Sequence, residues 1–189
     1  MKKIILKIRN SIYALFTPKM VNGFKTSKGE FLKNTRISNS TFIGNKENLF
    51  IENNVFIGHQ NFLDASNKLT IEEGCQITNF VSILTHSSHN SIRYYGKNYS
   101  GSNMKGYIKG SVFIGKFSFI GPHVTIMPNT KIGKGSIVSS HSYVSGEFPD
   151  FSIIGGNPAK IIGDTRTKDS LFFEQNPELK KNYNDWTNA

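Results

Sequence analysis

An aliphatic residue recurs every six positions in this sequence, and no other feature constrains the fold as strongly. Neither an α-helix nor an ordinary alternating strand has that period. The longest unbroken run consists of Ile108, Ile114, Ile120, Ile126, Ile132, Val138 and Val144. An earlier run, broken by two two-residue insertions, consists of Ile37, Ile43, Ile51, Ile57, Leu63, Ile71, Ile77 and Ile83. The chain therefore has an internal repeat, and repeats of this kind indicate a solenoid.

A second regularity accompanies the first. Small or β-branched residues stand four positions after many of the aliphatic ones, namely Val55, Cys75, Val81, Val112, Ser118, Val124, Thr130, Ser136 and Ser142. We interpret each repeat as a short strand followed by a corner, with both side chains pointing into a narrow interior. Three such faces close one coil, and a coil is stable only when it stacks on its neighbours.

The pattern resembles that of the hexapeptide-repeat family over residues 37 to 160. The segment IIGGNPAKIIG (residues 153–163) is similar to the one that closes the coil in sugar O-acetyltransferases of that family. The resemblance implies an all-β fold, a left-handed parallel β-helix, over residues 31–163. Its handedness follows from the resemblance and not from the period. Flanking it we expect an N-terminal helical, basic segment (1–30) and a C-terminal helical tail (164–189).

Both flanks carry apolar residues at helical spacing. The tail is expected to turn Leu171 and Phe172 inward and to be interrupted near Pro177. At the other end, Ile5, Ile8, Ile12, Leu15 and Phe16 share one helical face beside several lysines. This face fits either an anionic membrane surface or a protein surface. No stretch of the sequence is long and apolar enough to cross a bilayer.

Charge and cysteine content restrict the partners. The formal net charge of +10 predicts a surface that attracts anions, such as phosphorylated cofactors or anionic membrane. No nucleic-acid reader motif accompanies the charge, so we expect no nucleic-acid partner. The single cysteine, Cys75, cannot form an internal disulfide or a cysteine-based zinc site. These features suit a cytoplasmic protein, located at the inner face of the membrane if the N-terminal segment binds there.

The six-residue period fails between Ile83 and Ile108, which are 25 positions apart. A long excursion in a compact repeat fold is usually functional, because it contributes little to the core. The excursion, residues 86–107, follows directly on Thr85. It carries His86, His89, Arg93, Tyr94, Tyr95, Lys97 and Tyr99, which are polar or aromatic.

This excursion and the repeats after it are similar to those of maltose and galactoside acetyltransferases and of surface-glycan O-acetyltransferases. In these families a histidine shortly after a strand ending in Thr begins the long loop. His86 matches that position, and His89 is the second choice. An imidazole can take the proton from an attacking sugar hydroxyl and return it to the departing thiolate. A backbone N–H would bind the tetrahedral oxyanion.

The resemblance also implies acetyl-CoA as co-substrate, no required metal, and a homotrimer with its sites between subunits. The acceptor-binding candidates are Asn61, Asp64, His89 and Tyr94. For Asn61 and Asp64 the alternative is that they bind backbone amides at corners. The cofactor-binding candidates are Gly121, Ser139, Ser140 and Lys160, with the lysine near a phosphate. Ser145 and Gly146 replace a Thr-Lys pair common in relatives, which removes one expected phosphate contact.

Three functions therefore remain open. The first is an acetyl-CoA-dependent O-acetyltransferase acting on a cell-surface glycan (capsule, lipopolysaccharide or lipooligosaccharide) or its sugar precursor. The second is an N-acetyltransferase of a nucleotide-linked amino sugar or an antibiotic. The third is a non-catalytic or zinc-binding β-helix. His86 and His89 alone do not supply the histidines on neighbouring coils that a zinc site between subunits needs.

Overall fold

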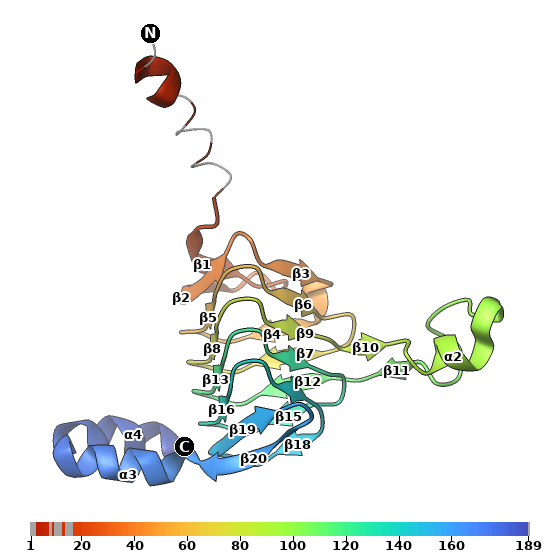
Figure 1. Cartoon of the computed structure of the whole chain (residues 1–189). Helices are drawn as coiled ribbons and strands as arrows, with labels where there is room; N and C mark the ends of the chain where they lie inside the picture. Colours follow the sequence, from red (N-terminus) through yellow and green to blue (C-terminus); the bar gives the residue numbers. More distant parts are fainter. Residues whose placement is uncertain (1–2, 8, 10–12, 14–16, 189) are drawn as a thin grey trace.

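The computed structural model describes residues 3–7, 9, 13 and 17–188 and shows a three-sided solenoid of short parallel strands (Figure 1). The first side contains β2 (Phe31–Ser38), β5 (Phe56–Ile57), β8 (Gln76–Ile77), β13 (Phe119–Ile120), β16 (Ile137–Val138) and β19 (Ser152–Gly156). The second contains β3 (Phe42–Gly44), β6 (Phe62–Asp64), β9 (Ser82–Ile83), β14 (Thr125–Ile126) and β17 (Tyr143–Val144). The third contains β4 (Leu49–Ile51), β7 (Leu69–Ile71), β12 (Val112–Ile114), β15 (Lys131–Ile132) and β18 (Glu147–Phe148). The prediction of an all-β parallel solenoid is confirmed.

The repeating aliphatic residues form the interior. Ile120 pairs with Ile77 in the coil before it and with Val138 in the coil after it. All three side chains are fully buried, as are the equivalent residues on the other two sides. Like residues therefore stack in ladders, and each coil buries the apolar edge of the next. The interior is narrow and closely packed, which is why the period is kept so strictly; in the last coil it admits Phe148, which pairs with Ile132.

The corners between the first and second sides have a left-handed backbone. Phe80, His123 and His141 occupy equivalent corner positions in successive coils, with φ between 58° and 60°. Their rings stack in one column with centroids 4.8 Å apart at both steps. Both histidines are exposed, as expected for corner residues. His59, also near this corner, instead places its Nδ1 2.7 Å from the Ser38 hydroxyl.

Antiparallel strands cover both ends of the solenoid. β1 (Met20–Lys25) pairs with β2, and β20 (Ala159–Asp164) pairs with β19. Residues 20–25 are thus a strand within the segment expected to be helical. A helical stretch spans residues 3–7, in which Ile5 is exposed; Ile8, Ile12, Leu15 and Phe16 lie outside the described residues. Among the described residues, no helix is long and apolar enough to cross a membrane.

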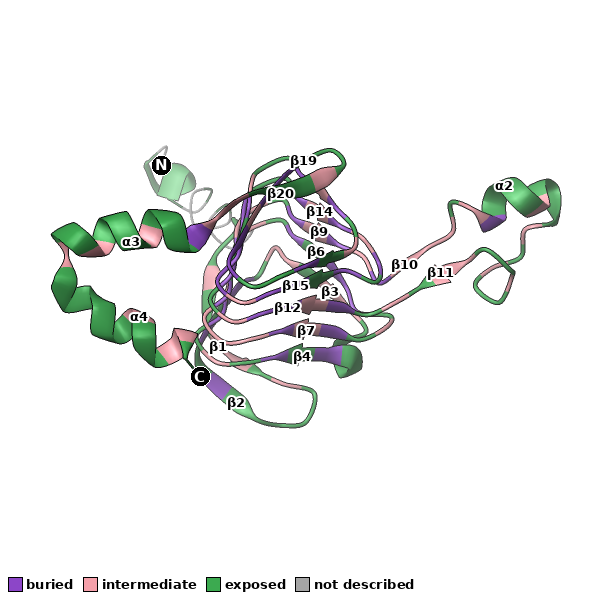
Figure 2. Ribbon diagram, turned by 90° about the horizontal axis from the view of Figure 1, so that it is seen from below, coloured by how far each residue is buried: buried purple, intermediate pink, exposed green. Residues whose placement is uncertain are grey.

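The C-terminal tail is a helical hairpin beside the solenoid (Figure 2). It consists of α3 (Thr165–Gln175), η3 (Pro177–Leu179) and α4 (Lys180–Thr187); one further short helix, η1 (Lys46–Asn48), lies in an early coil. Asp164 caps the start of α3, because its side chain accepts a hydrogen bond from the backbone N–H of Arg166. The expected helical tail, with a break at Pro177, is present.

Trp186 attaches this hairpin to the solenoid. Its ring lies 4.8 Å from that of Phe117 and 5.9 Å from that of Phe151, measured between centroids. Gly135, with φ of 65°, leaves room for it, since a Cβ there would lie 2.9 Å from the indole. The expectation for Leu171 and Phe172 is wrong: their side chains are 60% and 52% exposed. The contact with the solenoid is made by the opposite end of the hairpin.

Candidate active site

The excursion after Ile83 forms an arm that projects from the solenoid (Figure 1). Its base is a two-stranded antiparallel ladder of β10 (His86–Ser87) and β11 (Ile108–Lys109), and its distal part contains α2 (Ser91–Tyr95) and η2 (Gly96–Asn98). In the ladder His86 is directly opposite Lys109. His86 is therefore held by strand pairing at the point where the arm leaves the solenoid.

Asp64 lies directly beside the His86 imidazole. β6 pairs in parallel with β9, so the residue that ends β6 is close to the chain that enters the arm. The Asp64 Oδ2 atom lies 2.7 Å from the His86 Nδ1 atom, and the two side chains are 5% and 40% exposed. This contact is an ion pair without hydrogen-bond geometry, and the negative charge at this distance favours the tautomer with its proton on Nδ1. The Nε2 atom is then the one that can accept a proton.

Hydrogen bonds from Ser66 and Thr85 fix the Asp64 carboxylate. The backbone N–H and hydroxyl of Ser66 donate to Oδ1, and those of Thr85 donate to Oδ2. Burial alone would raise the pKa of Asp64, but these hydrogen bonds outweigh it and lower the pKa to about 2. Asp64 is therefore a fixed negative charge at neutral pH.

Asp64→Asn is expected to change how stability depends on pH. Because folding lowers the pKa of Asp64 from 3.8 to about 2, its ionised form stabilises the fold above about pH 4. That contribution is lost as the pH falls toward 2. The variant should melt roughly 5 °C lower at pH 7, since an amide cannot accept all four hydrogen bonds. The difference between the two melting temperatures, followed by circular dichroism, should shrink from pH 5 to pH 2. A constant difference would contradict this.

A cavity of about 310 Å³ opens beside His86. It is lined by Ser66, Asn67, His86, Ser102, Tyr107 and Lys109. The Tyr107 ring is stacked parallel to the imidazole, with centroids 5.8 Å apart and an angle of 6° between the planes. Burial, followed by the charges of Tyr99 and Asp64, raises the pKa of Tyr107, so its hydroxyl stays protonated at neutral pH. The cavity thus combines a proton acceptor with hydroxyl groups, an amide and a cation.

Sequence reasoning missed Ser66, Asn67, Tyr107 and Lys109. Asn67 holds Thr85 in place, since its backbone N–H donates to the Thr85 hydroxyl and its side-chain amide donates to the Thr85 carbonyl. The sequence does contain a signal for Tyr107 and Lys109. A loop that leaves and re-enters a solenoid brings its two ends together, so the residues just before Ile108 and just after it lie near His86.

The other acceptor candidates lie away from this cavity. Asn61 is buried at a corner, where its side-chain amide donates to the carbonyls of Gly58 and Thr78 and its oxygen accepts from the Val81 N–H. This geometry matches the alternative role of binding backbone at a corner. His89 is exposed on the arm, with Nδ1 2.7 Å from the Ser87 hydroxyl. Tyr94, in α2, is 66% exposed.

The four cofactor candidates lie together along the corner between the first and second sides. Gly121 is packed under the next coil, because a Cβ there would lie 2.7 Å from the Ser140 backbone nitrogen. Lys160 is exposed and pairs with Gly155, whose added Cβ would lie 3.3 Å from the Ser139 hydroxyl. The corner therefore offers closely spaced backbone, two serines and a cation, a surface that suits an extended phosphorylated ligand.

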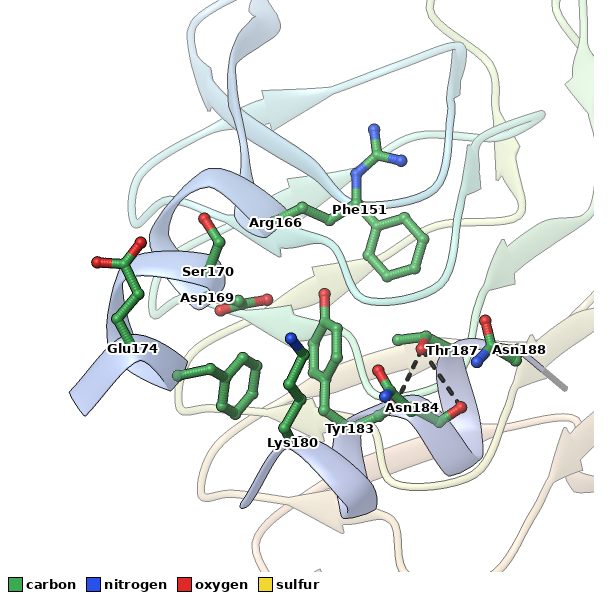
Figure 3. A pocket seen from close by; sticks show the side chains of 11 residues that line it. Phe151, Arg166, Asp169, Ser170, Glu174, Lys180, Tyr183, Asn184, Thr187 and Asn188 are labelled. Carbon is green, nitrogen blue, oxygen red and sulfur yellow. Dashed lines mark hydrogen bonds between the residues drawn. The ribbon is translucent and has the colours of Figure 1, made fainter. Parts of the chain in front are cut away.

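A larger cavity of about 620 Å³ lies within the C-terminal hairpin, between α3, α4 and Phe151 (Figure 3). Tyr183 stands in it near Asp169, and burial, followed by that carboxylate, raises the pKa of Tyr183 to about 12. Its lining contains no histidine or cysteine among the described residues. The hairpin and the arm project on opposite sides of the solenoid (Figures 1 and 2). The described lining of the larger cavity therefore lacks the imidazole that lines the smaller cavity beside His86.

No cluster of three or more His, Cys, Asp or Glu side chains that could hold a metal ion is present in the part of the chain that the structure describes.

Residues 111–146 match the family model of the bacterial transferase hexapeptide, six repeats. The resemblance to the hexapeptide-repeat family is confirmed. Within this segment the family's period is the same one that fills the solenoid interior.

Several known proteins to which this chain is similar are named as acyltransferases. It is 40% identical over 60 residues to the putative lipopolysaccharide biosynthesis O-acetyl transferase WbbJ of Escherichia coli (strain K12), covering 32% of this chain and 31% of that protein. A maltose O-acetyltransferase from Clostridium difficile 630 shares the fold with a TM-score of 0.55 and 19% identity, covering 67% and 64% of the two chains.

A second solved structure is similar over more of the chain. The N-acyltransferase AntD from Bacillus cereus, in complex with dTDP and 3-hydroxybutyryl-CoA, has a TM-score of 0.58 and 21% identity and covers 80% of this chain and 89% of its own. At such identities the two structures show the fold alone. The chain spans between a quarter and a third of the length of the first curated relatives it matches.

Proposed function

We propose that the protein is an acetyl-CoA-dependent O-acetyltransferase that acts on a hydroxyl of a cell-surface glycan or its sugar precursor, with His86 as general base. The observation that carries this proposal is the buried carboxylate of Asp64, 2.7 Å from Nδ1 of an imidazole that lines an open cavity. The similarity to a putative lipopolysaccharide O-acetyl transferase supports a glycan acceptor.

The proposed chemistry follows from that geometry. Nε2 of His86 takes the proton of the acceptor hydroxyl as its oxygen attacks the thioester carbonyl. The C–S bond then breaks, and the imidazolium returns the proton to the departing thiolate. Asp64 stabilises the imidazolium by its charge and does not itself take the proton, because its pKa is about 2.

We propose that acetyl-CoA lies along the corner formed by Gly121, Ser139 and Ser140. His86 follows β9, at the corner between the second and third sides. The three cofactor candidates instead lie at the corner between the first and second sides. One chain therefore separates its base from its own cofactor candidates by the width of a sheet. A neighbouring copy is needed to bring a thioester to His86, which supports a homotrimer with sites between subunits.

Lys160→Gln should raise KM for acetyl-CoA by about five- to tenfold and leave kcat nearly unchanged. A lysine on a phosphate contributes to binding in the ground state and the transition state alike. Initial rates at varied acetyl-CoA would measure this. Lys168→Gln, which removes another exposed charge from α3, is the matched control. Equal KM values for both variants would remove Lys160 from the cofactor site.

The activity itself can be tested by following free thiol during incubation with acetyl-CoA and a panel of sugars. Release of coenzyme A that depends on the acceptor is the expected result, together with binding of coenzyme A by calorimetry. If no acceptor releases thiol and coenzyme A does not bind, the proposal is wrong.

The similarity to AntD favours one alternative, N-acylation of a nucleotide-linked amino sugar. The two activities give chemically different products, since an ester is cleaved by neutral hydroxylamine and an amide is not. A panel that pairs dTDP-linked amino sugars with neutral and acidic sugars would separate them. A hydroxylamine-stable product formed only from the amino sugars would replace O-acetylation by N-acylation.

A further inference from the structure

Lys109 is the lysine in the lining of the cavity beside the proposed base. It is paired directly opposite His86 in the ladder at the base of the arm. Directly opposed residues of an antiparallel pair point to the same face, with Cβ atoms about 5 Å apart. Lys109 and His86 accordingly line the same cavity.

No carboxylate of the described residues forms an ion pair with this lysine. Within the described residues the ion pairs are His86 with Asp64 and Arg166 with Asp164, so neither involves Lys109. Its ammonium lies 5.8 Å from the centre of the Tyr107 ring and is exposed. Asp64 is buried beneath His86 and already accepts hydrogen bonds from Ser66 and Thr85. The open side of the cavity therefore carries positive charge.

The rest of the arm is also positively charged. Residues 87–107 contain Arg93, Lys97 and Lys105 and no Asp or Glu. The Arg93 guanidinium is used within the arm, where it donates to the His89 carbonyl and the Asn90 side chain. Lys97 and Lys105 are exposed. A ligand that approaches His86 along the arm meets cations and tyrosines and no carboxylate.

We propose that the acceptor is an acidic sugar, carrying a carboxylate or a phosphate, whose negative group pairs with Lys109 while its hydroxyl is presented to Nε2 of His86. This inference rests on the proposed function and narrows its substrate class. A lysine ammonium is a point charge that accepts either anion, so the shared chemistry is the negative charge. A hydrogen bond between charged partners that is not already satisfied within the protein contributes both affinity and orientation.

Galactose, galacturonic acid and galactose 6-phosphate form a matched set of probes, because they differ at one carbon. Binding measured by saturation-transfer NMR and thiol release with acetyl-CoA should both favour the acids by at least tenfold over galactose. Whichever acid is preferred identifies the group as carboxylate or phosphate. The preference should weaken as salt is raised, since the lysine is exposed.

Lys109→Gln should abolish the preference, and Lys109→Arg should retain most of it. Lys105→Gln, which removes an exposed charge from the same arm outside the cavity, should keep it. KM for acetyl-CoA should be the same in Lys109→Gln as in the unaltered protein. A change confined to that KM would assign the lysine to a phosphate of coenzyme A and overturn the inference.

The outcomes separate this inference from the proposed function. Thiol release that is equal for galactose and both acids would leave the transferase standing and overturn the acidic acceptor. Failure of both acids to bind would also overturn it. Lys109-dependent binding of an acid without thiol release from any acceptor would support the anion site and contradict the transferase.

Discussion

His86→Ala is expected to lower kcat/KM for acetyl transfer by about 10²–10⁴-fold, the range usual for loss of a general base. A free sugar hydroxyl is a weak nucleophile near neutral pH, and His86 is the histidine that lines the cavity. The measurement is the rate of thiol release at saturating acetyl-CoA. The fold should be retained, because the imidazole is 40% exposed and belongs to the arm rather than to the core.

His89→Ala provides the comparison for this loss. His89 lies three residues further along the arm, is exposed, and does not line the cavity. Its replacement should therefore cost far less activity than that of His86, with both variants melting close to the unaltered protein. If His89→Ala were inactive and His86→Ala active, the base would have to be assigned to His89.

The solenoid could be predicted from the sequence because its interior enforces the period. Each coil must place an aliphatic side chain at the same three positions, and Ile77, Ile120 and Val138 show this directly by stacking in register. The position of Asp64 near the start of the arm could also have been found by counting. Leu63 pairs with Ile83, so Asp64 lies beside Leu84, two residues before His86.

Features outside the repeat could not be derived in this way. The register that sets His86 opposite Lys109 depends on how the arm folds back, and no period specifies it. The apolar residues of the tail were also ambiguous. Leu171 and Phe172 have the spacing of a packed face, but Trp186 makes the contact with the solenoid and leaves them exposed. Helical periodicity indicates an apolar face without indicating what covers it.

Asp64→Asn is expected to reduce kcat by about 10²–10⁴-fold through the tautomer of His86. An amide nitrogen next to Nδ1 would donate to it, so the imidazole would carry its proton on Nε2 and could no longer accept one there. Asp64 is buried and does not line the cavity, which makes it a positioning residue. The loss should therefore appear in kcat, with KM for the acceptor little changed.

The distinguishing measurement is the ¹⁵N NMR spectrum of the imidazole of His86. The unaltered protein should show the neutral ring protonated at Nδ1, and Asp64→Asn should show it protonated at Nε2. Asp64→Asn also weakens the fold, so activity must be compared well below its melting temperature. If the tautomer were unchanged and activity fell only with the folded fraction, the role of Asp64 would be confined to holding Ser66 and Thr85. The base would then be oriented by the β10–β11 ladder alone, where His86 is paired with Lys109.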